Sequence, residues 1–166
     1  MLKIKGDRIM ENQNRAGDCH TCELIAQRDA GKAPLWDAIL RTEYWDIVHA
    51  YNTSLSGWLV LVVRRHITAV AEMTETEAGE LGNLIRRVSL ALQKVTGCTK
   101  TYVVQFAEQA EHPHVHFHII PRMADQPEAY KGTHIFDLLG VPPANRVTED
   151  KMNEIALGVR RALDSR

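Results

Sequence analysis

Apolar and polar residues alternate along several short segments of the chain, and this pattern predicts β-strands. Alternation is strictest over 114–120, while β-branched and aromatic residues dominate 101–106. The uninterrupted apolar run 58–63 predicts a central strand that is buried on both faces. Two further segments, 35–42 and 45–50, are rich in apolar and aromatic residues and predict a hairpin.

A longer, helical period predicts three helices. The helix with the clearest sequence signals begins at the capping-box pattern Thr74-Glu75-Thr76-Glu77 and ends at Gly97. A short helix is expected over 23–30, and a final amphipathic helix carries an apolar side. That side consists of Met152, Ile155, Val159 and Leu163. The order of elements indicates an α+β fold, with a five-stranded antiparallel sheet, a long helix and a C-terminal helix.

The domain organisation expected from this pattern is simple. Residues 1–17 are polar and aperiodic, which is typical of a flexible N-terminal arm. Residues 18–166 are expected to form a single domain, because the chain is 166 residues long and 45% apolar, which suits one core. Within that domain, residues 123–147 contain three prolines and two glycines and are predicted to be mostly loop.

Charge and hydropathy narrow the classes of function. A net charge of −1 argues against a broad surface for duplex nucleic acid, while a small anionic ligand remains compatible with it. The longest apolar run, 58–63, is far too short to span a bilayer, and residues 1–18 lack the hydrophobic stretch of a signal peptide. We therefore expect a cytoplasmic protein without a membrane partner.

The chain has three cysteines, and two of them form the pair Cys19-x-x-Cys22. In an intracellular protein this spacing favours metal binding or redox chemistry over a structural disulfide. Cys98 follows the glycine that ends the long helix and is expected to be a small buried residue.

The histidines carry the clearest chemical signal. Four of the 8 histidines lie at positions 112, 114, 116 and 118. Because successive side chains of a strand point to opposite faces, His114, His116 and His118 share one face. Imidazole titrates near neutral pH, acts as a nucleophile and ligates metals. The strand is expected to begin near Pro113 and to close at Pro121, which leaves the role of His112 open.

The segment His114–Ile120 resembles the signature of the histidine triad (HIT) family. Gly57–Ile67 resembles the glycine-led strand of that family, which ends in a basic pair and a histidine, and Cys19-x-x-Cys22 resembles its frequent N-terminal pair. The likeness covers about residues 19–122. It implies a HIT-like sheet and reaction at the α-phosphate of a nucleotide, through a covalent nucleotidyl-histidine intermediate.

The resemblance also implies roles for individual residues. His116 corresponds to the nucleophile, and His118 contacts the phosphate or the leaving group, to which it can deliver a proton. Relatives place an acidic residue or an asparagine for the ribose hydroxyls shortly before the glycine-led strand, so Asn52, the nearest match, is a candidate for this role. Gln105 is a candidate for contact with the phosphate or leaving group, and Gln109 competes with it.

A structural zinc ion is implied by the same likeness, without an organic cofactor. Relatives with zinc combine two cysteines with the histidine after the basic pair and the first histidine of the signature. The corresponding residues here are Cys19, Cys22, His66 and His114. A Cys₂His₂ set would close a tetrahedral structural site. In the absence of zinc, His114 would instead orient its neighbours.

The leading hypothesis is a homodimeric hydrolase of purine nucleotides, acting on phosphoramidates, acyl-nucleotides or dinucleoside polyphosphates. A nucleotidyltransferase or phosphorylase is an alternative, although the transferase branch commonly has glutamine where His118 stands. A purine-nucleotide binding protein with vestigial catalysis is a further alternative. A metalloenzyme using the histidine row would need a carboxylate ligand on the same face, and the row supplies none.

Overall fold

The computed structural model describes residues 19–165, and the arm predicted over 1–17 lies outside them. Eight helices and strands of regular structure organise the described part. The helices are α1 (His20–Asp29), α2 (Glu75–Thr96) and α3 (Glu149–Asp164). The strands are β1 (Leu40–Arg41), β2 (Trp45–His49), β3 (Leu59–Val63), β4 (Lys100–Val104) and β5 (His116–Arg122). The predicted α+β class, with five strands, a long helix and a C-terminal helix, is confirmed.

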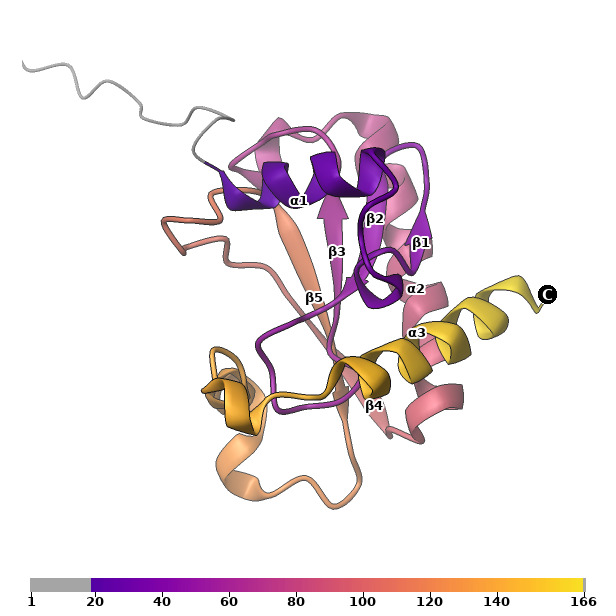
Figure 1. Ribbon diagram of the computed structural model, residues 1–166, viewed down its shortest axis with the longest axis vertical. Coiled ribbons are helices and arrows are strands. Elements are labelled where there is room, and N and C mark those ends of the chain that lie inside the picture. The colour runs from indigo at the N-terminus through magenta and orange to yellow at the C-terminus, as the bar shows by residue number, and fades with distance from the viewer. Residues whose placement is uncertain (1–18, 166) are drawn as a thin grey trace, which may run out of the picture.

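All neighbouring strands of the single sheet are antiparallel, in the order β1-β2-β3-β5-β4 (Figure 1). The most apolar strand, β3, is central, as its sequence predicts, and each of its five residues is buried. The histidine-bearing strand β5 lies beside β3, so its side chains meet a rigid apolar neighbour.

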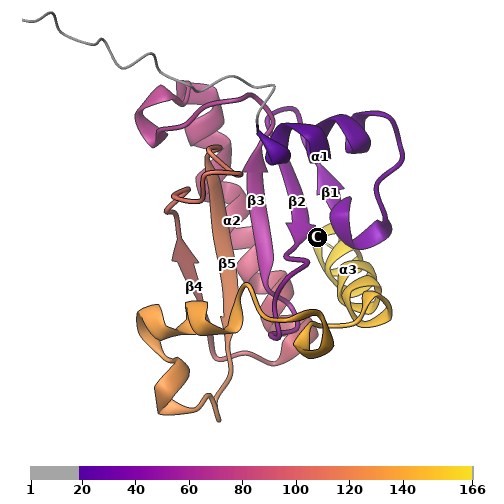
Figure 2. The same cartoon turned by 60° about the vertical axis from the view of Figure 1, so that its left-hand side comes forward.

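The two faces of the sheet carry two separate apolar clusters. On one face Leu59, Leu61 and Val63 pack with residues of α2 and α3. On the other face Trp58, Val60 and Val62 pack with Ile25 of α1 and with Ile135. Figure 2 shows α2 behind the sheet, with α1 and the segment after β5 on the opposite side. Because His116 and His118 are paired with Val62 and Val60, they lie on the face that α1 covers.

The long helix forms where its caps predict. The Thr74 hydroxyl accepts a hydrogen bond from the Glu77 amide at 3.2 Å, and the Glu77 carboxylate accepts one from the Thr74 amide at 2.7 Å. At the other end Gly97 adopts a φ of 72°, the left-handed conformation that glycine tolerates best.

Besides a small shift of the strand expected over 101–106, which spans Lys100–Val104, three predicted boundaries need correction. In the first half of the hairpin, residues 35–37 form a 3₁₀ turn and only residues 40–41 pair with β2. The strand expected over 114–120 spans His116–Arg122, with Pro121 inside it rather than closing it. Pairing with β3 ends at Ile119, so Pro121 has a strand neighbour on one side only, where a missing N–H is tolerated.

The third correction is the start of α1, which begins at His20 rather than near Glu23. Its N-cap, Cys19, makes no side-chain capping bond, so the sequence carried no start signal there. The loop predicted over 123–147 contains three short 3₁₀ helices but no α-helix or strand. Among the described residues, no helix combines the length and apolarity needed to cross a membrane.

Candidate active site and metal centre

His116 is held by the backbone of its own strand. Its Nδ1 lies 2.7 Å from the carbonyl oxygen of His114. A carbonyl oxygen only accepts, so Nδ1 carries the proton and the neutral ring keeps a lone pair on Nε2. Burial lowers the pKa of His116 below its usual value, which favours this neutral form.

His118 is held in the opposite tautomer. The indole Nε1–H of Trp58 donates to His118 Nδ1 at 3.0 Å, and since indole is a donor only, Nδ1 must accept. The proton of the neutral ring is therefore on Nε2. Burial, with a smaller contribution from His116, lowers the pKa of His118 to about 3. The two rings meet edge to face, with centroids 4.9 Å apart, so a lone pair and an N–H donor stand side by side.

A cavity of about 340 Å³ opens over both imidazoles. The floor is apolar and comes from the sheet: Val48, Val60 and Val62. One wall is the inner side of α1, and the remaining walls come from the loop after β2, the loop after β4 and the segment after β5. The wall residues from these elements include Thr21, Leu24, Arg28, Asn52, Phe106, Gln109, Phe136 and Leu139. The volume suits a small organic ligand with an apolar body.

The structure separates the predicted binding residues. Asn52 and Gln109 line the cavity, whereas Gln105 does not. His114 is fully buried and also lies outside the lining, although it belongs to the same row as His116 and His118. Of the three histidines, two therefore face the cavity and one faces elsewhere.

His114 points at the cysteine pair instead. Its Nε2 lies 2.6 Å from the carbonyl oxygen of Val63 and so donates to it, which leaves a lone pair on Nδ1. That Nδ1 is 3.7 Å from Cys19 Sγ and 3.5 Å from Cys22 Sγ. His66 Nδ1 lies 3.2 Å from Cys22 Sγ. All four predicted ligand residues, Cys19, Cys22, His66 and His114, bring one ligand atom within 4.8 Å of the others.

These residues fit a tetrahedral zinc ion. Metal–ligand bonds of roughly 2.0–2.3 Å place neighbouring ligand atoms about 3.5 Å apart, which matches the sulfur–nitrogen distances above. The hydrogen bond from His114 Nε2 to the Val63 carbonyl would fix the orientation of this imidazole toward a metal ion. Burial and the neighbouring Cys19 raise the pKa of Cys22 to about 12, so the thiol stays protonated unless a cation displaces the proton.

The polar residues of the cavity wall that had no predicted role include Arg28, Asp37, His49 and His112. For His112, the two-residue spacing to His114 could have indicated a place in the histidine row. Pro113 argued against this, because the strand was expected to begin near it. Arg28 and Asp37 carried no motif, because their meeting depends on how α1 packs on the hairpin.

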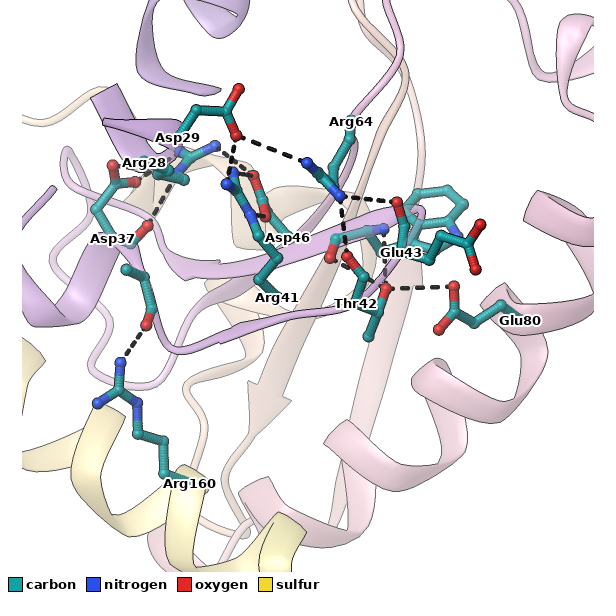
Figure 3. Close-up of polar contacts among 12 residues, drawn as sticks. Arg28, Asp29, Asp37, Arg41, Thr42, Glu43, Asp46, Arg64, Glu80 and Arg160 are labelled. Carbon is teal, nitrogen blue, oxygen red and sulfur yellow. Dashed lines mark hydrogen bonds and ion pairs between the residues drawn. The ribbon is translucent and has the colours of Figure 1, made fainter. Parts of the chain in front are cut away.

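Arg28 and Asp37 belong to a buried network of charges at the C-terminal end of α1 (Figure 3). Arg28 Nη2 donates to the Asp37 carboxylate at 2.7 Å, and its Nη1 reaches Asp46 at 3.4 Å. Arg41 binds the same Asp46 through Nε at 2.6 Å and also pairs with Asp29. Burial raises the pKa of Asp37 against the opposing effect of Arg28. The network ties α1 to β1, to β2 and to the 3₁₀ turn at residues 35–37 that precedes β1.

This structure defines a small α+β protein in which β5, the neighbour of the central strand, presents paired imidazoles to a cavity, beside a Cys₂His₂ cluster. Its family follows from the sequence: the family model of the HIT domain matches residues 37–125, more than half of the chain, and the chain belongs to this family. No curated protein sequence matches significantly.

Solved structures with the same fold include a zinc-bound histidine triad family protein from Mycobacterium smegmatis. That structure matches with a TM-score of 0.63 and 15% identity, over 90% of this chain and 95% of the other. A hypothetical histidine triad nucleotide-binding protein from Sulfolobus tokodaii matches with a TM-score of 0.65 and 16% identity, over 86% and 92% of the two chains. At such identities the likeness establishes the fold alone.

Proposed function

We propose that the protein is a nucleotide hydrolase that works through a covalent nucleotidyl-histidine intermediate. The observation that carries the proposal is the pair of opposite tautomers. His116 keeps a lone pair on Nε2, and the adjacent His118 keeps a proton on the same ring atom. A nucleophile next to a hydrogen-bond donor is what in-line displacement at phosphorus requires.

In the first step His116 Nε2 attacks the α-phosphorus, so a P–N bond forms while the bond to the leaving group breaks. His118 Nε2–H donates a hydrogen bond at the same centre. Because the Trp58 N–H occupies Nδ1 and opposes the imidazolium, His118 keeps its Nε2 proton and stabilises the developing charge by this hydrogen bond, while the departing atom takes its proton from water. In the second step water attacks phosphorus, the P–N bond breaks and the nucleoside monophosphate leaves.

The remaining cavity suits a purine nucleoside. Leu24, Val48 and Val60 offer apolar surface in the same cavity, which fits a flat base. We assign the ribose to Asn52 and prefer Gln109 over Gln105 for the phosphate or leaving group, because only Gln109 lines the cavity. Phosphoramidates, acyl-nucleotides and dinucleoside polyphosphates all present the required phosphorus centre.

We further propose that the cluster of Cys19, Cys22, His66 and His114 binds a structural zinc ion. All four ligand positions are filled by protein, which leaves none for a substrate. When bound, zinc would supply a crosslink between the start of α1 and the strands that carry the histidines, with no part in the chemical steps. His114 serves the site through this crosslink rather than by contact with the substrate.

A homodimer is proposed on the available surface. At the outer edge of the sheet, Val103 of β4 is 43% exposed, and Leu90 of α2 is also 43% exposed. An unpaired strand edge flanked by apolar side chains favours pairing with a second copy. The cytoplasmic location stays the prediction made from the hydropathy of the sequence.

The test is steady-state release of AMP from adenosine phosphoramidate and from diadenosine polyphosphates, by the wild type and by His116→Ala. We expect turnover by the wild type and a loss of at least 10³-fold in the variant, as for removal of a covalent nucleophile. Formation of a nucleoside diphosphate when inorganic phosphate is added would indicate phosphorolysis. Binding of AMP without turnover of any substrate would indicate a binding protein.

A further inference from the structure

His112 lies in the wall of the cavity that His116 and His118 also line. It precedes β5 and is separated from the histidine row by Pro113. The chemistry proposed above uses two imidazoles and leaves His112 without a role. A half-buried imidazole in the wall of this cavity can form a hydrogen bond with a ligand, and no such partner has yet been assigned to it.

Four contacts fix His112 in place. Its backbone N–H donates to the Gln109 carbonyl at 2.9 Å, and its carbonyl accepts from the His114 N–H at 2.7 Å. Its Nδ1 lies 2.9 Å from the Thr21 hydroxyl, and its ring meets His20 edge to face at 5.2 Å. The ring is therefore held from two sides, by its own loop and by the first turn of α1.

The Thr21 contact decides which ring nitrogen is available. Nδ1 is occupied by the hydroxyl, so Nε2 is the nitrogen left for a ligand. Since a hydroxyl can rotate to donate, the neutral ring can accept at Nδ1 and keep its proton on Nε2. This is the tautomer that Trp58 imposes on His118. The site then offers a second imidazole N–H donor, from the loop before β5.

We propose that His112 is a phosphate-binding residue of this site, whose Nε2–H donates to an oxygen of the nucleotide phosphate held at His116. The inference rests on the proposed function and extends it by one substrate contact. It also gives the Cys19-x-x-Cys22 segment a role in binding, because Thr21, which orients His112, lies between the two cysteines. The first turn of α1 thus connects the metal centre to the phosphate.

The experiment compares dissociation constants for AMP and for adenosine, measured by calorimetry on the full chain. The variant His112→Phe keeps a ring against His20 but removes both nitrogens. A hydrogen bond to a charged group contributes enough that we expect AMP to bind about tenfold more weakly, with adenosine unchanged. His112→Gln retains an N–H donor and is expected to recover part of the AMP affinity.

His134→Gln is the matched control, because His134 is an exposed histidine that does not line the cavity. It should bind AMP like the wild type, whereas Thr21→Val should weaken AMP binding in the direction of His112→Phe. Unfolding temperatures of all variants are recorded to show that they fold.

Two results overturn the inference. If His112→Phe binds AMP as tightly as the wild type, the contact does not exist. If it loses AMP and adenosine affinity equally, the residue is structural. In both cases wild-type AMP binding and turnover leave the proposed function standing. A wild type that binds neither AMP nor adenosine contradicts the function as well as the inference.

Discussion

His49 is a buried imidazole that the fold keeps neutral. Its Nδ1 donates to the Ala50 carbonyl at 2.8 Å, and its Nε2 accepts from the Gly57 N–H at 2.9 Å. Only one neutral tautomer satisfies both partners, since a proton on Nε2 would face the N–H of Gly57. Burial lowers the pKa of His49 to about 4.

This pKa makes stability depend on pH in a defined direction. In the unfolded chain the histidine titrates near 6.5, so between pH 6.5 and 4 the unfolded state binds the extra proton. The contribution of His49 is fully present above pH 6.5 and is lost as pH falls to 4, amounting to about 3 kcal/mol.

The measurement is urea unfolding of the wild type and of His49→Gln at several pH values. We expect the wild type to be the more stable at pH 7 and its advantage to shrink by pH 4. A difference in the free energy of unfolding that stays constant with pH would contradict the assignment. The comparison cancels the contributions of the other histidines.

Single residues also show the limit of prediction from sequence. His116 and His118 were found because a period of two puts them on one face of a strand, whatever surrounds it. That His114 turns to the cysteines depends on β3 offering the Val63 carbonyl. Arg28 and Asp37 could not be assigned to the cavity, because their place depends on the packing of α1.

Among the elements, α1 is the one most dependent on polar contacts. The Arg28 guanidinium joins it to Asp37 and Asp46, and both carboxylates are almost completely buried. Removing one partner of a buried ion pair leaves an uncompensated charge, which costs far more than the pair contributes. We therefore expect Arg28→Met to lower the free energy of unfolding by about 3–5 kcal/mol.

Chemical denaturation checks this value, with Lys151→Ala as the control. Lys151 pairs with Glu154 at 2.7 Å on the exposed side of α3, and its loss should stay within about 0.5 kcal/mol. Equal effects of the two variants would mean that the Arg28 network does not hold α1.

The ends of an element were predictable where the residues that determine them are close in sequence. They were not predictable where they depend on packing against other parts of the chain. The ends of α2 follow from Thr74, Glu77 and Gly97, which act within one turn of the helix. The start of α1 had no such signal, because the side chain of its N-cap residue, Cys19, makes no capping bond. Cys19 is instead held by its contact with His114, which is distant in sequence. The extension of β5 through Pro121 required knowing that β3 ends earlier.

At the scale of the whole molecule, the Cys₂His₂ cluster joins parts that are far apart in sequence. Cys19 and His114 are separated by 95 positions, and His66 belongs to a third segment. A zinc ion there would hold α1 at its N-terminal end, opposite the Arg28 network. We expect about one zinc ion per chain and a lower unfolding temperature after chelation.

Elemental analysis measures the zinc content, and thermal unfolding measures the unfolding temperature, of the wild type and of two cysteine variants. Cys22→Ser should lose the metal and unfold at a lower temperature that chelator no longer changes. Cys98→Ser is the control, because Cys98 is buried away from the cluster and should leave the zinc content intact. Wild-type protein free of metal and indifferent to chelator would refute the proposal.

Association of two chains is the last property that the sheet suggests. The edge strand β4 exposes Val103 on the same face as Thr101, whose hydroxyl lies 2.8 Å from Ser89 on α2. Leu90 follows Ser89, so the exposed apolar side chains of strand and helix lie close to one edge. Pairing of two such edges would continue the sheet and cover both residues.

Sedimentation velocity over a range of concentrations tests this arrangement. We expect the wild type to sediment as a dimer of 18.8 kDa chains and Val103→Lys to sediment as a monomer, because burying a charge at the pairing edge is unfavourable. Leu157→Lys changes a residue of matching exposure, 45%, on α3, which packs beside β2 toward the other edge of the sheet, and should remain dimeric. A wild type that sediments as a monomer would contradict the proposed dimer. A monomeric Leu157→Lys together with a dimeric Val103→Lys would indicate that the interface lies on α3 instead.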